Sequence, residues 1–579
     1  MEFKLHNPVK LYLSELIQKA ISESFSKDIE LEEIYSMLSI PPKLENGDFA
    51  FGCFKMSKDL KKSPPEISKV LSEKIKEPNE NNYVLSITAM GPYLNFKLSA
   101  EFILKNICLT GDIVKRSEKT IIEFSQPNTH KEMHVGHMRN LCLGDAIIKL
   151  HRFAGVETIA TTFPGDVGTH VAKCLWYYTH YTDQKAPSED RKGAWLGTLY
   201  TKGNNLLEEE KGTAKEEENR KILTQILKEI EAGSGKYFDL WQETREWSID
   251  LMKDVYKWAD VEFDHWYWES TVDSDSVKLI KEYYDKGLFI KDDGAIGIDL
   301  SDYKLGFCLL LKSDGTGLYA TKDVELARRK FQDHNVERSI YVVDNRQALH
   351  FKQVFKTLEI MGFENAKNCY HLQYEMVELP DGAMSSRKGN IVPLQDLIDN
   401  MQEKIKNDYL NKYIGEWDQT EIEETAKEIA KGAIKFGMNK IDPNKKIVFD
   451  MQEWLKLDGE SGPYIQYVYA RIQSMLAKTS IPESVDFTLL TDAYEGNLAL
   501  HLLNFNDIIE KALKENKTNI LANYLYDVAK SFNQFYANCP VLKNDNEALK
   551  NARVHLSLKT AKTLSKGLEL LGIKCPSRM

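Results

Sequence analysis

A short β-rich run that leads directly into a helix constrains the fold of this chain more than any other feature. The run is Thr120–Ser125, and Pro127 ends it because proline cannot donate a ladder hydrogen bond. The stretch Met138–Phe153 follows with apolar residues at helical spacing. Thr158–Phe163 has the pattern of the next strand. This order predicts a βαβ unit of the nucleotide-binding kind.

Two histidines stand at the start of that helix, in the motif His134-Val135-Gly136-His137. Because His134 and His137 are three residues apart, they project from one side of the first turn, where backbone N–H groups favour an anion. Each imidazole can donate to negative charge that develops on a phosphate. Gly136 has no side chain, so a base or ribose can approach the backbone. Taken alone, the motif is equally consistent with two ordinary turn histidines.

A second motif, Met384-Ser385-Ser386-Arg387-Lys388-Gly389, follows a turn at Pro380-Asp381-Gly382. Arg387 and Lys388 stand among serines and glycine, and a flexible loop with two cations can close over a triphosphate. By itself, this loop would be read as an ordinary exposed basic segment. Together, at opposite ends of one predicted α/β domain, the two motifs predict a site that binds the phosphates of ATP.

The length of 579 residues is too great for one compact domain. Residues 1–112 have the pattern of a small α+β domain, and residues 113–400 that of an α/β domain. A helical subdomain with runs of charge is expected to be inserted at about 180–265, its charges forming a solvated face. From 401 to 579 the period is almost entirely helical. We therefore expect a multidomain α/β protein with an all-α C-terminal part.

Composition narrows the classes of function. The net charge of -11 argues against a surface coated nonspecifically with basic residues, although a local basic patch is enough to bind nucleic acid. The eight cysteines contain no CxxC pair, which is typical of reduced cytosolic thiols and argues against a structural zinc site. No run of about 18 apolar residues predicts a membrane helix. We expect a cytoplasmic enzyme without membrane association.

The two motifs together resemble those of the class I aminoacyl-tRNA synthetases, and other segments narrow the resemblance to the arginyl-tRNA synthetase family. The resemblance runs from about residue 46 to 579 and implies a Rossmann-like catalytic domain, an N-terminal domain that contacts tRNA and a helical anticodon-binding domain. The similar segments are Ser125-Gln126-Pro127-Asn128, Lys131-Glu132-Met133 leading through the histidine motif to Arg139-Asn140, Gly165-Asp166-x-Gly168-Thr169, Asp314-Gly315-Thr316 with Tyr319 and Asp323, Gly462-Pro463-Tyr464-x-Gln466-Tyr467-x-x-Ala470-Arg471, and Leu570–Met579.

The resemblance implies an ATP site, with Mg²⁺ bound to the nucleotide and no protein metal ligand. Its expected residues are His134, Gly136, His137, Gly165, Asp166, Gly168, Thr169, Met384, Ser385, Ser386 and Lys388. The second motif departs from the KMSKS pattern of these synthetases, because Ala383 stands where the first lysine is usual. Lys131 resembles a lysine proposed to compensate. Which cation meets pyrophosphate therefore stays open between Lys131, Arg387 and Lys388.

An arginine substrate requires acids, because its planar guanidinium is gripped best by a carboxylate through two parallel hydrogen bonds. Glu123 ends a strand beside the histidine motif, and the resemblance implies that it faces the substrate. Asp323 lies four residues after Tyr319, so the two share a helix face. Asn128 and Gln347 are candidates for the polar remainder of the amino acid. A surface carboxylate or a helix cap is the alternative for each acid.

The C-terminal part is the candidate tRNA interface. Residues 541–579 contain eight Lys and Arg against three acids. Tyr464 and Tyr467 stand one helical turn apart with Arg471 beyond them, and aromatics beside arginine suit stacking of unpaired bases. Core tyrosines and a merely soluble lysine surface are the alternative. The resemblance favours anticodon reading here and adds Met579 to the expected contacts.

The resemblance implies a two-step ligase. The carboxylate of L-arginine would attack the α-phosphate of ATP, and tRNA(Arg) would then accept the arginyl group on its terminal adenosine. We expect a monomer, and an activation step that needs bound tRNA. Two rival hypotheses are another adenylyl-transferring enzyme with an HxGH motif, usually far shorter, and a non-catalytic tRNA-binding relative.

Overall fold

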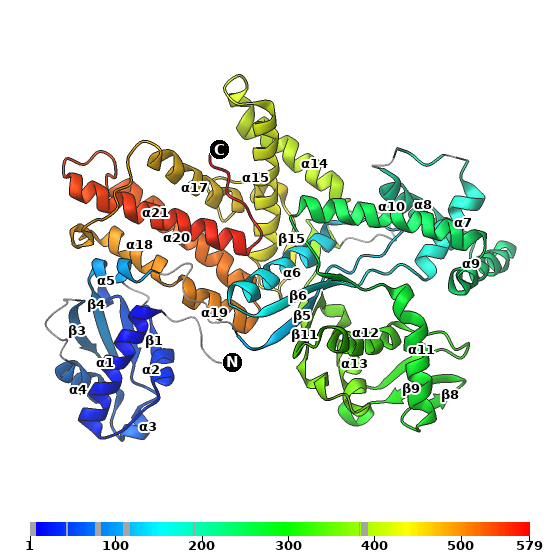
Figure 1. The fold of residues 1–579 in the computed structure, drawn as a ribbon, viewed down its shortest axis with the longest axis horizontal. Helices are drawn as coiled ribbons and strands as arrows, with labels where there is room; N and C mark the ends of the chain where they lie inside the picture. Colours follow the sequence, from blue (N-terminus) through cyan, green and yellow to red (C-terminus); the bar gives the residue numbers. More distant parts are fainter. Residues whose placement is uncertain are drawn as a thin grey trace.

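The structure is a computed structural model that describes residues 7–41, 44–75, 83–107, 116–183, 185–188, 191–380, 382–383 and 392–579. The second motif, with Met384, Ser385, Ser386, Arg387 and Lys388, lies outside these residues. The chain forms a central α/β body, a separate N-terminal lobe and a helical C-terminal lobe (Figure 1). This is the multidomain α/β class that the sequence predicted.

A five-stranded parallel sheet forms the centre of the molecule, in the order β12-β11-β5-β6-β7. The chain runs from β5 through β6 to β7 on one side, and later adds β11 and β12 on the other. The carboxyl ends of β5 and β11 therefore flank a point where the strand order reverses, which is where open α/β sheets bind ligands. The strands are β5 (Lys119–Glu123), β6 (Glu157–Thr162), β7 (His265–Trp266), β11 (Arg338–Asp344) and β12 (Cys369–Tyr374).

The predicted βαβ unit is confirmed. Helix α6 (Val135–Phe153) connects the parallel strands β5 and β6. Four helices then lie between β6 and β7 and form the arm on the right of Figure 1. They are α7 (Thr169–Tyr181), α8 (Lys192–Glu209), α9 (Ala214–Ala232) and α10 (Lys236–Trp258).

Part of residues 113–400, which the sequence assigned to one α/β domain, does not join the central sheet. Strands β9 (Ala295–Asp299) and β10 (Phe307–Leu311) pair with β8 (Ile290–Asp292) in a separate antiparallel sheet, in the order β10-β9-β8. A β-rich stretch predicts a strand but carries no information about which sheet the strand joins. Helices α11 (Glu269–Asp285), α12 (Tyr319–His334) and α13 (Ala348–Ile360) pack with this part (Figure 1).

The N-terminal lobe is a four-stranded antiparallel sheet in the order β1-β2-β4-β3, with helices packed against it. Helix α4 begins as expected at its proline pair, with a capping box between Ser63 and Glu66. The elements are α1 (Pro8–Phe25), α2 (Leu31–Met37), β1 (Leu38–Ser39), β2 (Phe49–Gly52), α3 (Ser57–Leu60), α4 (Pro64–Lys74), β3 (Val84–Met90), β4 (Tyr93–Leu98) and α5 (Ala100–Lys105).

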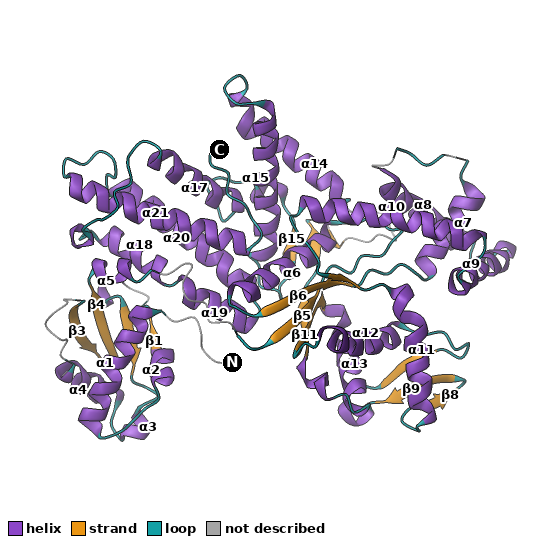
Figure 2. Ribbon diagram, in the orientation of Figure 1, coloured by secondary structure: helices purple, strands orange, loops and turns teal. Residues whose placement is uncertain are grey.

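The C-terminal part is helical, as predicted, with one short strand (Figure 2). That strand, β15 (Ile447–Val448), joins β13 (Val377–Leu379) and β14 (Gly382–Ala383) in a small sheet. The helices are α14 (Leu394–Ile405), α15 (Gln419–Asn439), α16 (Met451–Trp454), α17 (Gly462–Leu476), α18 (Ala493–Leu503), α19 (Phe505–Glu515), α20 (Thr518–Asn538) and α21 (Glu547–Leu570).

A buried ion pair joins the helical lobe to the helix that carries the histidine motif. Lys435 of α15 is fully buried and its Nζ lies 3.2 Å from a carboxylate oxygen of Asp145 on α6. Arg139 of α6 is also buried and donates to the carbonyls of Pro443 and Lys445, at 3.3 and 2.9 Å. Removing one partner would leave an uncompensated buried charge, so these contacts fix α6 against the lobe.

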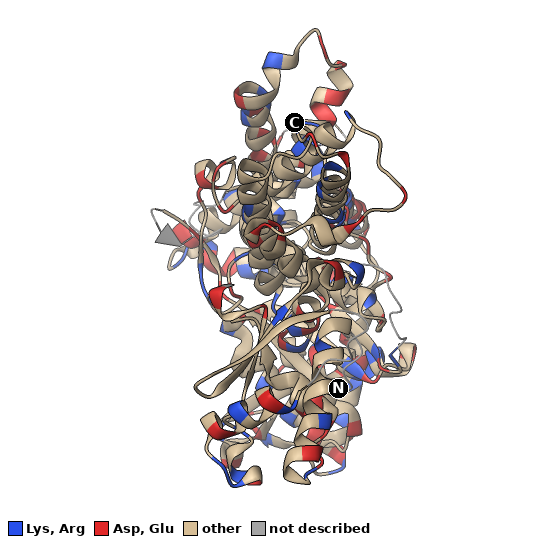
Figure 3. Cartoon of the chain, turned by 90° about the vertical axis from the view of Figure 1, so that its left-hand side faces the viewer, with Lys and Arg blue, Asp and Glu red and all other residues tan. Residues whose placement is uncertain are grey.

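Charges of both signs are interspersed along the elements on the side of the molecule that carries the N-terminal lobe and the helical lobe (Figure 3). This distribution agrees with the net charge of -11. Among the helices within the described ranges, none is long and apolar enough to cross a membrane.

Helices α15 and α17 cross so closely that the contact requires glycine. A Cβ on Gly462 would lie 2.1 Å from the carbonyl oxygen of Gly432, whereas a Cβ on Gly496 in α18 would meet nothing within 4 Å. We predict that Gly462→Ala lowers the thermal midpoint, by a destabilisation of about 1–3 kcal/mol from overpacking. The matched variant Gly496→Ala should stabilise by up to about 1 kcal/mol through helix propensity. Equal shifts in calorimetric scans of the two variants would contradict this close crossing.

Candidate functional site

A cavity of about 290 Å³ lies at the reversal of strand order in the central sheet. Residues after the carboxyl ends of β5, β6 and β11 line it, together with the first turns of α11 and α12. It contains five of the residues expected to bind the amino acid, namely Glu123, Asn128, Tyr319, Asp323 and Gln347, and also His137 and Gly165. Residues far apart in the sequence therefore meet where the sequence analysis placed a substrate.

The two motif histidines hold the first turn of α6. His134 is the N-cap, and its Nδ1 accepts a hydrogen bond from the backbone N–H of Gly136 at 3.1 Å. Nδ1 of His137 accepts from the backbone N–H of His134, also at 3.1 Å. The ring centroids are 4.0 Å apart. Because each Nδ1 is an acceptor, each neutral ring carries its proton on Nε2, which remains as a donor.

Both imidazoles are held in the neutral state. Burial, followed by the nearby charges of Arg346 and Lys131, lowers the pKa of His134 to about 4. Burial also lowers the pKa of His137 well below its ordinary value, and His134 and Lys131 add to the effect. The pair can therefore offer two N–H donors near neutral pH without carrying charge of its own.

The chain that follows the second motif pairs directly with the first motif. The backbone N–H of Val135 donates to the carbonyl of Val392 at 3.3 Å, and Leu394 donates to the carbonyl of Met133 at 3.0 Å. His134 and Pro393 form an isolated antiparallel bridge. On the other side, β14 ends at Ala383, directly before the motif. The described residues on the two sides of the second motif thus belong to a small sheet before it and lie beside the start of α6 after it.

Two cations act on the histidine pair. Lys131 lies with its Nζ 4.8 Å from the ring centre of Tyr200 and lines a neighbouring cavity of about 330 Å³. Tyr319 lines both cavities, so they adjoin. Arg346, which follows β11, is the second cation and was missed in the sequence, because its nearness to His134 arises only from the order of strands in the sheet.

Glu123 is buried at the end of β5 and is already paired. One carboxylate oxygen bonds to Nζ of Lys330, which is fully buried and lies 3.8 Å from the ring centre of Tyr341. The other oxygen accepts from Nε2 of Gln126 at 3.1 Å. The alternative interpretation of Glu123 as a surface carboxylate is therefore excluded. Its negative charge is largely balanced within the protein, so it offers a hydrogen-bond acceptor more than a net charge.

Asp323 and Tyr319 stand on the first turns of α12, as their spacing predicted. Asp323 is partly buried, and its Oδ2 lies 2.5 Å from Nε2 of His350 on α13. Burial lowers the pKa of His350, but the hydrogen bond and charge of Asp323 outweigh it, so the pKa lies above its ordinary value. Tyr319 is 69% exposed and stands at the mouth of the cavity with its ring unenclosed.

Two further acids line the cavity and were not singled out in the sequence. Glu269 begins α11, where burial raises the pKa of its carboxyl to about 7 although Lys322 lies 3.4 Å away. Asp344 ends β11 and binds Arg346 through both oxygens, at 2.8 and 3.1 Å. No local pattern marks either residue, because both are brought to the cavity by pairing of distant segments.

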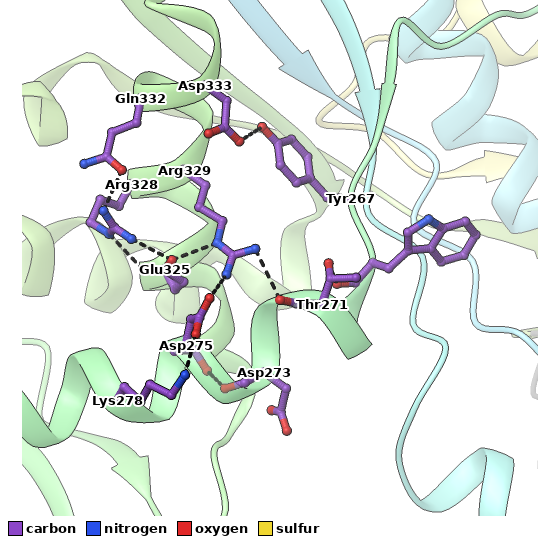
Figure 4. A network of polar contacts seen from close by, with 12 residues as sticks. Tyr267, Thr271, Asp273, Asp275, Lys278, Glu325, Arg328, Arg329, Gln332 and Asp333 are labelled. Carbon is purple, nitrogen blue, oxygen red and sulfur yellow. Dashed lines mark hydrogen bonds and ion pairs between the residues drawn. The ribbon is translucent and has the colours of Figure 1, made fainter. Parts of the chain in front are cut away.

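An ion network locks together the two helices that carry these groups (Figure 4). Glu325 of α12 is buried and binds both Arg328 and Arg329. Arg329 also reaches α11, at 2.6 Å from Asp275 and 3.2 Å from the carbonyl of Thr271. The first turns of α11 and α12 are therefore held in fixed relation, which fixes the distance between the acids that they contribute.

The glycine-punctuated loop after β6 lines the cavity only in part. Gly165 bridges to Asn128, and its carbonyl accepts from the backbone N–H of Thr129 at 2.9 Å. Gly168 has a φ of +117° and caps α7. Thr169 is exposed and lines the neighbouring cavity with Lys131. This loop therefore separates the two cavities.

Asp166 does not line either cavity, contrary to the expectation that it binds ATP. Its carboxylate is fully buried and accepts from Arg245 Nε at 2.8 Å, and from the Oγ and backbone N–H of Ser270 at 2.6 and 2.9 Å. These bonds tie the loop to α10 and α11. The residue acts on the site through the position of the loop, because its oxygens are turned away from the cavity.

Asn140 is a site residue that the sequence analysis quoted only as part of a pattern. Its Oδ1 accepts from the backbone N–H of Ser125 at 2.6 Å, and its Nδ2 donates to the carbonyl of Val342 at 2.9 Å and to Tyr374 at 3.1 Å. One amide thus joins α6, the end of β5, β11 and β12. The signal was its place six residues after His134, on the helix that the motif begins.

The four residues expected to contact tRNA divide into two kinds. Tyr464 is partly buried in the helical lobe, where its OH accepts from Asn533 at 2.8 Å. Tyr467 is exposed, and the exposed Arg471 guanidinium lies 4.4 Å from the ring centre of Tyr536. The carbonyl of Met579 accepts from Tyr413 at 3.1 Å. Tyr467, Arg471 and Tyr536 form the accessible aromatic and cationic surface.

Three family models match successive parts of the chain. The model described as "tRNA synthetases class I (R), catalytic domain" matches residues 101–451. The "Arginyl tRNA synthetase N terminal domain" matches residues 12–98, and the "DALR anticodon binding domain" matches residues 465–579. The N-terminal match follows the N-terminal lobe of Figure 1. The catalytic match covers the central body and extends into α14 and α15 of the helical part, and the third match covers the rest of that part from residue 465.

Similar proteins match along nearly the whole chain. A Bdellovibrio bacteriovorus protein named arginine–tRNA ligase is 50% identical, over 99% of this chain and 100% of that protein. A Clostridium botulinum protein of the same name is 36% identical, over 95% and 97% of the two chains. The solved Thermus thermophilus arginyl-tRNA synthetase superposes with a TM-score of 0.82 at 27% identity, covering 99% of this chain and 100% of its own.

Buried neutral histidines predict acid sensitivity. His151 of α6 is buried without a partner for Nε2 among the described residues, and burial lowers its pKa to about 4. Because the unfolded value is about 6.5, the unfolded chain takes up a proton first, so stability is full above pH 6.5 and falls as pH drops toward 4. As pH falls through this window, the free energy of unfolding decreases. We predict that His151→Leu reduces the slope of this decrease by about 1.4 kcal/mol per pH unit. If the thermal midpoints of wild type and His151→Leu depended on pH in the same way, a buried neutral His151 ring would be contradicted.

Proposed function

The chain belongs to the arginyl-tRNA synthetase family, and from this premise we propose how its site joins L-arginine to tRNA(Arg). In the first step the arginine carboxylate attacks the α-phosphate of ATP, giving arginyl-adenylate and pyrophosphate. In the second step the terminal adenosine of tRNA accepts the arginyl group and AMP leaves. One observation supports a single site for ATP and arginine. Val392–Leu394, which follow the second motif, pair with Met133–Val135 beside the proposed amino-acid cavity.

The 290 Å³ cavity is the proposed arginine site. The guanidinium would bind between Asp323 and Glu123, with Tyr319 closing over it at the mouth. Asn128 and Gln347 would hold the α-amino and carboxylate end toward α6. A ligand without the cation leaves the carboxylate of Asp323 without its expected partner, which is how such a site rejects neutral analogues.

ATP phosphates would lie at the first turn of α6, where the helix dipole favours negative charge. The Nε2–H groups of His134 and His137 would donate to the phosphate on which charge develops. Gly136 leaves room for the nucleotide, as Gly165, Gly168 and Thr169 would on the facing loop. Asp166 would hold that loop without touching the nucleotide. Mg²⁺ would travel with the phosphates, since it binds few protein ligands.

The cationic second motif would close over pyrophosphate as it leaves. Met384, Ser385 and Ser386 would contact the nucleotide, while Arg387 and Lys388 would neutralise the leaving group. Lys131 and Arg346 supply positive charge beside His134 on the described side of the site. Several cations would therefore neutralise the negative charge of the leaving pyrophosphate, which explains how the chain tolerates Ala383 in place of a lysine.

The helical lobe would read the anticodon through the accessible surface at Tyr467, Arg471 and Tyr536, with Tyr464 and Met579 supporting it. The described cysteines are all free thiols, which suits a reduced compartment, and we propose a monomer that works in the cytoplasm.

Arginine-dependent exchange of pyrophosphate into ATP tests the proposed function. We expect exchange with arginine and tRNA(Arg), weaker or absent exchange without tRNA, and none with lysine or citrulline. Exchange with a different amino acid would overturn the arginine assignment. Absence of exchange under every condition would leave a tRNA-binding protein.

A second prediction concerns the imidazole donors. His137→Ala should lower kcat for exchange by about 10²–10³, the usual cost of one lost transition-state donor. The KM for arginine should change by only a few-fold, because Asp323 and Glu123 remain in place. Steady-state kinetics at saturating ATP separate the two effects, and equal losses in kcat and in arginine affinity would contradict a transition-state role.

A further inference from the structure

The charges of the arginine cavity are almost balanced within the protein. Four acids line it, and three of them form ion pairs with a lysine or an arginine. These three pairs are Glu123 with Lys330, Glu269 with Lys322, and Asp344 with Arg346. A cavity with every acid paired in this way would have no reason to attract a cation.

Asp323 is the exception, because its partner can become neutral. Nε2 of His350 lies 2.5 Å from Oδ2 of Asp323, and no hydrogen bond engages Oδ1 from within the described part of the chain. With His350 neutral, Asp323 carries a negative charge that is not balanced by its partner. With His350 protonated, the imidazolium balances that charge. The state of this histidine thus decides whether Asp323 offers the uncompensated charge that a guanidinium needs.

We propose that His350 positions Asp323 for the substrate guanidinium, and that arginine and a proton on His350 compete for this carboxylate. The inference rests on the proposed function of the cavity. The neutral ring donates Nε2–H to Oδ2, which fixes the carboxylate and leaves Oδ1 directed to the substrate. When arginine binds to the protonated form, the imidazolium releases one proton to solvent, while Nε2–H stays on Asp323.

The side chains around His350 support the release of its proton when arginine binds. Its ring packs edge-on against Phe351, which in turn lies against His371 of β12, with ring centroids 5.2 and 4.6 Å apart. Burial, opposed by a backbone hydrogen bond from His371 to Val343, lowers the pKa of His371, and the charge of His350 lowers it further.

The remaining charged groups on the elements packed against α13 either form contacts of their own or lie far from His350. Asp344 of β11 is held by Arg346 of the 3₁₀ turn Asn345–Gln347. The turn Glu364–Asn368 packs at the opposite end of α13, away from the first turn that carries His350. The burial that opposes protonation of His350 is outweighed by Asp323, so the pKa of His350 lies above the ordinary value.

Glu269 also titrates in the cavity and must be separated from His350, since the pKa of its carboxyl is about 7. Protonation of either group weakens attraction for a cation as pH falls. Two substitutions separate these contributions to the pH dependence of binding. Glu269→Gln retains the contribution of His350 alone, and His350→Gln retains only that of Glu269. Glutamine keeps an amide donor for Asp323 and cannot take up a proton.

The test is the dissociation constant of L-arginine, measured by calorimetry on the full chain from pH 6.0 to 8.5. We expect wild-type affinity to fall as pH falls, by up to about tenfold per unit for each of the two groups that exchanges a proton. His350→Gln should match wild type within a few-fold at pH 8.5 and bind more tightly than wild type at pH 6.0. The matched variant His371→Gln should follow the wild-type curve.

A constant ratio of affinities between His350→Gln and wild type across this range would overturn the proposal and leave a purely structural histidine. Should that variant fail to fold, Glu269→Gln still decides the matter. Its binding of arginine at pH 6.5, compared in two buffers of different ionisation enthalpy, should release protons, and zero release would also overturn the proposal. Arginine-dependent pyrophosphate exchange by the wild type tests the function of the cavity separately, so the two failures are distinguishable.

Discussion

Two backbone N–H groups in the first turn of α6 are bound by imidazole nitrogen atoms, and the chemistry of the site depends on this constraint. It fixes the orientation of both rings, and it fixes the tautomer, because an Nδ1 that accepts a hydrogen bond leaves the proton on Nε2. Burial keeps the rings neutral. A helix start normally offers only its own N–H groups to an anion. Here the N–H groups of Val135, Gly136 and His137 are bonded within the protein, and the helix start presents two side-chain donors instead, pre-aimed at no cost of reorganisation.

The same turn is also the point where distant parts of the chain meet. Met133–Val135 pairs with Val392–Leu394, which follows the second motif, and Asn140 joins α6 to the ends of three strands. Buried contacts of Arg139 and Lys435 fix the helix against the C-terminal lobe. The two histidines, the cavity at the central sheet and the C-terminal lobe therefore all contact one helix, so a displacement of that lobe would move the histidines.

Sequence patterns predicted what depends on local order. The strand, the turn at Pro127 and the helix after it follow from period and proline chemistry, and Tyr319 and Asp323 share a helix face because of their spacing. The contacts of the site could not be predicted in the same way. Lys330 meets Glu123 across 207 positions and His350 meets Asp323 across 27, so neither pair has a local signature. The buried bonds of Asp166 could not be foreseen either, because a glycine-rich loop does not reveal which way its one acid turns. Strands β9 and β10 form a separate sheet with β8, because a β-rich pattern does not reveal which strand will be its partner.

A crystal structure of the chain with ATP and L-arginine bound tests the central claim most directly. The account predicts phosphate oxygens within hydrogen-bond reach of Nε2 of both His134 and His137, roughly 3 Å. It also predicts the guanidinium on Asp323 and residues 384–389 over the phosphates. A triphosphate bound away from the first turn of α6, or a guanidinium that leaves Asp323 to His350 alone, would contradict it.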